Sequence, residues 1–321
     1  GKGAFGEVYR VRHLSLNVTR AIKILQRNAP GVGSTDYQDV QTRFQLEAQL
    51  GARLHSPTPH PNLLQVHDLR LAEDILVLEM EYAPGGDLSR KIQSAQITAT
   101  PIPLEEVIRT GIDISRALAA LHQLDVVHRD LKPANILYDL SGHARLADLG
   151  LAQIPHGPSQ RSQLSSPIPH PGTAATMSPE QANSTGYLTS ASDVFALGAV
   201  LYEMLTGRVY RSLRPGTRAL KYRTDTPAWL DDLLFSMLSV KPEDRPWDGM
   251  EVLNLLEQED TRRKLEEETK EKARLEQEEN LKRREQQEQE RQAELARRSE
   301  EHTSELQSLR HLVCRLLLEK K

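Results

Sequence analysis

The sequence predicts an α+β domain over residues 1–256, followed by a long charged α-helix. Three observations predict this. Short apolar segments with the composition of strands occur in the first part of the chain, and longer apolar segments there have helical period. Near residue 257 the composition changes sharply to charged residues and glutamine, with no Gly or Pro.

The strands come first. Branched apolar residues predict strands at YRVRHL (9–14), RAIKIL (20–25) and ILVLEM (75–80).

Apolar residues at helical spacing predict helices. The segments are the amphipathic TRFQLEAQLGARL (42–54), VIRTGIDISRALAALHQL (107–124) and DVFALGAVLYEML (193–205). Between the last two lies the Pro-rich run 155–172, a long loop of the kind that is functional or disordered in compact domains.

Residues 257–297 predict a solvated single helix. Alternating charges favour i,i+4 pairs, whereas the irregular spacing of Leu265, Leu275, Leu281 and Leu295 lacks the heptad seam of a coiled coil. A spacer helix is the favoured interpretation. A weak coiled coil, with self-association or a partner contact through this segment, is the alternative.

Composition excludes several classes of protein. The 321 residues carry a net charge of -4, which gives no support to nucleic-acid binding. No uninterrupted apolar run reaches the ~18 residues of a membrane span. The single cysteine, Cys314, excludes an internal disulfide framework, and no Cys/His cluster has zinc-ligand spacing.

A glycine-rich turn opens the chain. Gly1, Gly3, Gly6 and Val8 form the pattern GxGxxGxV ahead of a strand, and glycines let the backbone lie against phosphates. Lys23 then sits on an apolar strand, where burial requires a partner. Glu47 is the only acidic residue between Asp39 and Asp68, so we expect it to be that partner.

The strongest signal is VVHRDLKPANILYD (126–139) followed by ARLADLGLA (144–152). Asn135 and Asp148 supply two oxygen donors that suit Mg²⁺. Asp130 is then free to orient a hydroxyl, and Lys132 to neutralise a transferring phosphate.

At these residues the chain resembles the eukaryotic-type (Hanks-type) serine/threonine protein kinases, most closely the bacterial members. GKGAFGEV resembles the family's glycine-rich loop, RAIK its strand lysine, HRDLKPAN its catalytic loop and DLG its magnesium-binding motif. SPE (178–180), DVFALG (193–198) and Arg245 in PEDRPW follow in family order, and Arg245 matches the arginine that pairs with Glu180.

The resemblance implies a bilobal fold and the roles of its residues. The small β-rich N-lobe (1–80) lacks its first strand, the hinge is 81–83, and the large helical C-lobe is 84–256. With ATP and Mg²⁺, or Mn²⁺ in its place, Lys23 held by Glu47 contacts the α- and β-phosphates. Asp148 and Asn135 hold the metal, Asp130 accepts the hydroxyl proton, and Lys132 sits near the γ-phosphate.

For the nucleotide, the resemblance implies an adenine site at the hinge. Met80 takes the gatekeeper position, Glu81 to Ala83 pair with adenine, and Asp87 meets the ribose. Val8, Ala21 and Leu137 enclose the ring.

Substrate class also follows from the resemblance. Lys132 is the serine/threonine form, and Thr173 matches the threonine that bonds the catalytic aspartate and lysine, so protein Ser/Thr hydroxyls are the expected acceptors. Arg129 before Asp130 implies switching by a phosphate on the loop. The candidates are Ser159, Ser162, Ser165 and Ser166, although an ordinary loop role fits each serine equally well.

Two residues depart from the family pattern. Leu149 replaces the usual Phe of DFG, and Gly51 stands where an apolar residue is usual, one turn beyond Glu47. Because the first strand is missing ahead of Gly1, we expect residues 1–256 alone to be poorly stable and nearly inactive.

An active, cytoplasmic protein kinase domain is the leading interpretation. A pseudokinase scaffold, joined through the charged helix to a missing sensor or effector domain, is the alternative. The retained Lys23, Glu47, Asp130, Asn135 and Asp148 argue against it, because a scaffold needs none of them.

The last segment, RSEEHTSELQSLRHLVCRLLLEKK (298–321), resembles one reading frame of a common sequencing adapter. We therefore exclude it from the functional argument and expect an exposed helix that does not pack through Leu306, Leu309, Val313 and Leu316. We also expect the natural chain to begin before Gly1 and to continue past Arg297.

Overall fold

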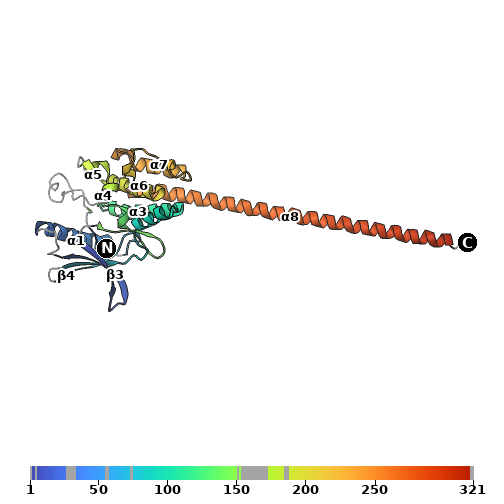
Figure 1. The fold of residues 1–321 in the computed structure, drawn as a ribbon, viewed down its shortest axis with the longest axis horizontal. Coiled ribbons are helices and arrows are strands. Elements are labelled where there is room, and N and C mark those ends of the chain that lie inside the picture. Colours follow the sequence, from blue (N-terminus) through green and yellow to red (C-terminus); the bar gives the residue numbers. More distant parts are fainter. Residues whose placement is uncertain are drawn as a thin grey trace. The chain divides into compact units, whose positions relative to one another are not determined.

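We describe the protein from a computed structural model, which describes residues 2–3, 6–26, 34–54, 58–72, 75–149, 152, 173–183 and 188–318. The chain divides into two compact units, residues 1–259 and 260–321. In the first unit, the sheet and α1 lie at one end and α3, α5, α6 and α7 at the other (Figure 1).

A five-stranded antiparallel sheet forms the smaller lobe, with strand order β1-β2-β3-β5-β4. Its strands are β1 (Lys2–Gly3), β2 (Gly6–His13), β3 (Val18–Gln26), β4 (Val66–Ala72) and β5 (Ile75–Glu81). The three predicted strands are confirmed as β2, β3 and β5. The two-residue β1 and strand β4 were not predicted.

Helix α1 (Ser34–Leu54) packs on this sheet against β4 and β5. A small core of seven buried residues lies in this lobe, with Phe44 of α1 and Leu78 of β5 at most 1% exposed. The predicted amphipathic helix is thus confirmed, and its apolar stripe covers the sheet.

The larger lobe is mainly helical. Its helices are α2 (Leu88–Thr98), α3 (Leu104–His122), α4 (Thr173–Thr176), α5 (Pro179–Asn183), α6 (Ser190–Thr206) and α7 (Ala228–Met237). Single 3₁₀ turns occur at η1 (Pro133–Asn135), η4 (Tyr210–Ser212), η5 (Ala219–Lys221) and η6 (Pro242–Asp244).

Helices α3 and α6 confirm the two strongest helical predictions and form the centre of the main core. Leu118 and Leu197 are among the residues there with 0% exposure. Thr189 and Ser192 close a capping box at the start of α6, and Gly207 ends it in the left-handed conformation (φ 68°).

A two-stranded antiparallel hairpin, β6 (Ile136–Tyr138) and β7 (Ala144–Leu146), lies between α3 and α4 in the sequence and directly follows the catalytic-loop motif. Gly142 turns it with a φ of 78°. Strand β7 packs against α3.

Helix α8 (Gly249–Leu318) closes the first unit and continues as the second. The predicted charged helix is confirmed, and pairs such as Lys282 with Glu278 (2.8 Å) support it. Among the residues that the structure describes, no helix is both long and apolar enough to cross a membrane.

Candidate active site

Lys23 lies inside the sheet, and its side chain joins three elements. Strand β3 pairs it with Val8 of β2 and with Leu78 of β5. The residue is 5% exposed, and its Nζ lies 3.0 Å from Oε2 of Glu47 and 3.0 Å from Oδ1 of Asp148. Because a buried ammonium group is costly without a partner, these two carboxylates explain how Lys23 can be buried.

Charges within this triad shift the pKa of all three groups. Burial alone would lower the pKa of Lys23, but the charges of Asp148 and Glu47 raise it. Burial alone would raise the pKa of Asp148, but the charge and hydrogen bond of Lys23 lower it. Burial raises the pKa of Glu47, and Asp148 adds to the rise against the opposing charge of Lys23. Asp148 is therefore ionised at neutral pH, as a ligand for a cation must be.

The segment between α3 and β6 brings Asp130, Lys132 and Asn135 together. Lys132 Nζ lies 2.7 Å from Asp130 Oδ2, and Asn135 Nδ2 donates to the Asp130 backbone oxygen at 2.8 Å and to Oδ2 at 3.1 Å. Asp130 is 4% exposed. These contacts hold the Asp130 carboxylate in place beside Lys132 and Asn135.

Oxygen donors for a divalent cation remain on Asn135 and Asp148. The amide nitrogen of Asn135 points at Asp130, so its Oδ1 is turned the other way, and Lys23 uses only one oxygen of Asp148. Ala147 N donates to Asn135 O at 2.8 Å, which ties the two residues together. Within the described residues no three His, Cys, Asp or Glu side chains form a metal cluster. Two oxygen donors fit Mg²⁺, which takes few protein ligands when phosphates supply the rest.

Asp193, at the start of α6, fixes the backbone of the catalytic loop through hydrogen bonds. Its carboxylate accepts from the backbone N–H of His128 at 2.7 Å and of Arg129 at 2.9 Å, and it contacts His122 Nε2 at 3.1 Å. Arg129 (φ 68°) and Asp148 (φ 65°) both adopt the left-handed conformation, which costs free energy and needs such support. The sequence predicted the motif around Asp193 but no role for this residue.

An apolar cluster in the smaller lobe includes residues that pair with the strand of Lys23. Val8, Ala21, Met80, Ala83 and Leu137 all belong to the apolar cluster of the smaller lobe, with Ala21 paired to Met80 across the sheet. These five residues, which the resemblance places at the adenine site, thus belong to one cluster, and the adenine site itself stays a prediction.

Comparison with known proteins decides the family. The model for the protein kinase domain matches residues 1–259 of this chain. The chain belongs to the protein kinase family.

Three relatives show where in the family it lies. It is 32% identical to a probable serine/threonine-protein kinase of Clostridium perfringens over 80% of this chain and 37% of the relative. It is 36% identical to the serine/threonine-protein kinase PrkC of Bacillus subtilis (65% and 30%) and 30% identical to the tyrosine-protein kinase MasK of Myxococcus xanthus (76% and 39%). The chain thus spans less than half the length of these curated relatives, and the suspected kinship to bacterial kinases is confirmed.

Some of the expected kinase residues lie outside the described residues or have further contacts. Gly1 and the loop serines Ser159, Ser162, Ser165 and Ser166 lie outside the description, as does the side chain of Thr173, where α4 begins. Gly3 and Gly6 pair across β1 and β2. Thr176, which the sequence analysis missed, donates from Oγ1 to the Leu131 carbonyl at 2.6 Å and so ties this segment to the catalytic loop.

At the hinge, the carboxylates of Glu81 and Asp87 already have protein partners. Glu81 Oε2 lies 3.2 Å from Arg145 of β7, and the Glu81 N–H donates to the Gln65 carbonyl at 2.8 Å. Asp87 caps α2 by accepting from the Arg90 N–H at 3.0 Å. A ribose hydroxyl would therefore share the Asp87 carboxylate with the helix end.

Both departures from the kinase pattern are accommodated. Leu149 is 6% exposed and belongs to the main core, so it fills an apolar site as expected. Gly51 is buried, and a Cβ at this position would lie 2.8 Å from Cγ2 of Val66. The missing side chain lets α1 approach β4 closely, which answers how this helix packs without an apolar residue there.

Arg245 and Glu180 form the predicted pair. The guanidinium donates from Nη1 and Nη2 to the two carboxylate oxygens at 2.8 and 3.0 Å. Burial alone would raise the pKa of Glu180, but the hydrogen bonds of Arg245 and Ser192 lower it to about 2. This bidentate pair fixes α5, which carries Glu180, to the rest of the helical lobe.

Proposed function

We propose that the protein transfers the γ-phosphate of Mg-ATP to serine or threonine hydroxyls of protein substrates. One observation carries the proposal: Lys23 bridges Glu47 and Asp148 at 3.0 Å each, although the three residues come from β3, α1 and the segment after β7. A buried ammonium between two carboxylates is expensive to maintain, and phosphate binding is the use that this family makes of it.

The reaction follows from the placed groups. Lys23 would bind the α- and β-phosphate oxygens, and Asn135 and Asp148 would hold Mg²⁺, which neutralises phosphate charge when bound. Asp130, with one oxygen fixed by Lys132 and Asn135, would orient the substrate hydroxyl and accept its proton as the bond to phosphorus forms. Lys132, 2.7 Å from Asp130, would stabilise the charge on the transferred group.

The hydroxyl acceptor is proposed from Lys132, the serine/threonine form of the loop, and from the names of most relatives. Because one relative is named a tyrosine-protein kinase, the acceptor must be measured. Residues 257–297 would serve as a spacer, with a weak coiled coil as the alternative.

An assay with radiolabelled ATP and a generic protein substrate tests the proposal. The 321-residue chain, a longer form with additional residues before Gly1, and Asp130→Asn in each are compared. We expect Asp130→Asn to lower incorporation at least about 100-fold, since it removes the proton acceptor. Hydrolysis of the product should give phosphoserine and phosphothreonine.

Equal incorporation by the parent and by Asp130→Asn would contradict the catalytic assignment. No incorporation by either form, with ATP binding retained, would favour the scaffold. Phosphotyrosine as the main product would refute only the proposed acceptor.

A further inference from the structure

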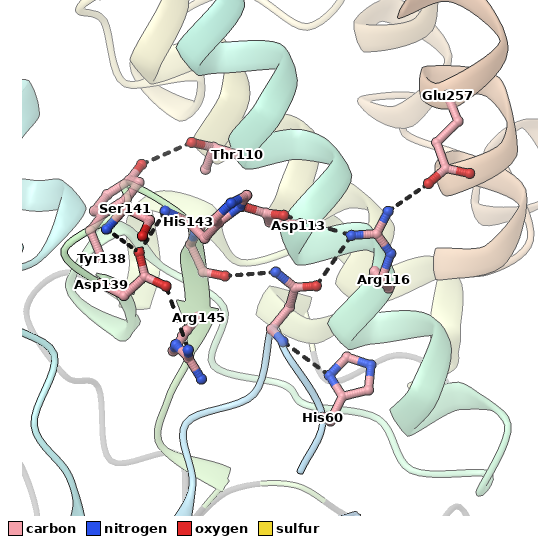
Figure 2. Close-up of polar contacts among 12 residues, drawn as sticks. His60, Thr110, Asp113, Arg116, Tyr138, Asp139, Ser141, His143, Arg145 and Glu257 are labelled. Carbon is pink, nitrogen blue, oxygen red and sulfur yellow. Dashed lines mark hydrogen bonds and ion pairs between the residues drawn. The ribbon is translucent and has the colours of Figure 1, made fainter. Parts of the chain in front are cut away.

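Arg116, on α3, has contacts that the proposed reaction does not use. Its Nη2 lies 2.6 Å from Oε1 of Glu257, and its Nη1 lies 3.4 Å from Oδ1 of Asn62 and 3.7 Å from Oδ1 of Asp113. Figure 2 shows the guanidinium pointing from α3 toward Glu257 on one side and Asp113 on the other. One side chain thus connects α3, the N-terminal part of α8 and the segment before β4.

Asn62 in turn clamps strand β7. The residue is 2% exposed, its Nδ2 donates to the Ala144 carbonyl at 3.1 Å, and its backbone oxygen accepts from the Leu146 N–H at 2.8 Å. Both ends of the three-residue strand β7 are therefore bonded to one residue. A buried amide specifies an orientation only when its oxygen is also satisfied, and Arg116 Nη1 donates to that oxygen at 3.4 Å.

Strand β7 leads directly to the proposed metal ligand. Ala147 follows the strand and bonds Asn135, and Asp148 comes next. Asp113, beside Arg116, accepts from the Ala144 N–H at 2.9 Å and so holds the same strand from α3. The position of Asp148 relative to Lys23 and Asn135 depends on how these contacts fix β7.

The second terminal nitrogen of Arg116, Nη2, is held by Glu257 in the N-terminal part of α8. Val252 and Leu256 are 0% exposed, and Gly249 lies so close to α3 that a Cβ there would meet the Ala119 nitrogen at 2.6 Å. Because this turn of α8 is firmly packed, Glu257 gives the guanidinium a fixed partner. Arg116 is 38% exposed, so the carboxylate and not burial sets its direction.

We propose that Arg116 is a positioning residue, which orients the Asn62 clamp and through it strand β7 and Asp148, and which Glu257 holds in place. The inference rests on the proposed function for the role of Asp148. It requires arginine, because a planar guanidinium reaches two acceptors in different directions, whereas one ammonium group of lysine does so poorly.

The test uses the full chain with Arg116→Met, Arg116→Lys and Glu257→Gln. Arg218→Met is the matched control, because Arg218 is 40% exposed and also has a carboxylate partner at 2.6 Å, on Asp232. Amide hydrogen exchange at residues 144–147, the thermal midpoint, and the Mg²⁺ concentration for half-maximal rate are measured for each variant. Exchange needs no activity, and the rate measurements use the longer form if only that form is active.

For Arg116→Met we expect at least about fivefold faster exchange at residues 144–147 and about a tenfold higher Mg²⁺ requirement, since outer contacts of a metal ligand tune its affinity. Arg116→Lys should have the thermal midpoint of the parent, but its exchange rate and Mg²⁺ requirement should rise nearly as much as in Arg116→Met. Glu257→Gln should raise the exchange rate and the Mg²⁺ requirement less. Arg218→Met should change neither.

Unchanged exchange and Mg²⁺ requirement in Arg116→Met would overturn the proposal. So would a lower thermal midpoint alone, which indicates a purely structural pair, and so would full recovery of both readouts by Arg116→Lys. If Asp130→Asn matches the parent in activity, the proposed function fails while the exchange data still decide whether Arg116 fixes β7.

Discussion

Asp193 is one buried carboxylate that fixes the backbone of two catalytic-loop residues, His128 and Arg129. Burial alone would raise its pKa, but the hydrogen bond and charge of His122, with the charge of His128, lower it. The ionised form can accept from all its partners at once. An amide at the same place would turn an N–H group toward one of the donors.

We therefore predict that Asp193→Asn lowers the free energy of unfolding by about 3 kcal/mol, since charged buried hydrogen bonds are lost. The released loop should also lower kcat at least about tenfold, because misplacing a catalytic group is costly. Urea unfolding and steady-state kinetics measure both. Asp232→Asn, whose side chain is 70% exposed, is the control and should lie within about 0.5 kcal/mol of the parent. A kcat equal to that of the parent would contradict the role given to Asp193.

The sequence predicted the pairs that short motifs specify. Lys23 with Glu47 and Arg245 with Glu180 each join charged residues at family positions, and the structure places both pairs in contact. Asp193, Thr176 and Asn62 could not be assigned in this way. Most of their hydrogen-bond partners are backbone groups, which every residue carries and which leave no signal in the sequence.

At the scale of elements, Gly51 determines how closely α1 approaches the sheet. Helix α1 carries Glu47 one turn earlier, so its distance from β4 affects the Lys23 pair. The absent Cβ leaves room for Val66, whose Cγ2 and Cβ would otherwise lie at 2.8 and 2.9 Å.

We predict that Gly51→Ala destabilises the protein by about 1–2 kcal/mol. The overpacking costs about 1–3 kcal/mol and exceeds the gain in helix propensity of about 1 kcal/mol. Chemical unfolding measures the change, and kcat should fall with it as Glu47 moves. Adding Val66→Ala, which removes Cγ2 but leaves the Cβ contact, should recover part of both losses. The exposed Gln49→Ala is the control on the same helix. A stabilised Gly51→Ala would show that the close approach does not constrain α1.

Long elements with regular period were predictable, and short ones were not. Helices α3 and α6 repeat apolar residues over many turns, and β2, β3 and β5 are rich in branched residues. Strand β4 (VHDLRLA) mixes charged and apolar residues at the edge of the sheet, and α4 and α5 are single turns. Strand β4 is as long as β5 but lacks a run of branched apolar residues, and the single-turn helices are too short to show a period, so all three depend on tertiary contacts rather than on local preference.

At the scale of the whole molecule, the two units differ in what stabilises them. The first has an extensive buried core, whereas the charged helix 260–318 depends on local ion pairs. Leu306, Leu309 and Val313 are 57%, 61% and 53% exposed, as expected for a helix that buries no apolar stripe. The origin of residues 298–321 from adapter sequence stays a prediction.

The stability of the first unit should depend on pH through Glu180. Its folded-state pKa of about 2 lies below the ordinary value of 4.5. Between these two pH values the folded state therefore binds fewer protons than the unfolded state. The stabilisation by Glu180 is therefore complete above pH about 4.5 and is lost as pH falls toward about 2. Once protonated, Glu180 would leave Arg245, whose side chain is 0% exposed, without its charged partner.

We predict that Glu180→Gln lowers the free energy of unfolding by about 2 kcal/mol near neutral pH, because two charged hydrogen bonds are weakened. The difference from the parent should shrink as pH falls from about 4.5 toward about 2, since the protonated parent then resembles the amide. Urea titrations at several pH values measure it. The matched control is Glu203→Gln on α6, a carboxylate whose pKa burial raises, so its effect should not follow this acid window. A difference between Glu180→Gln and the parent that stays constant from neutral to acid pH would mean that Glu180 is not held ionised by Arg245.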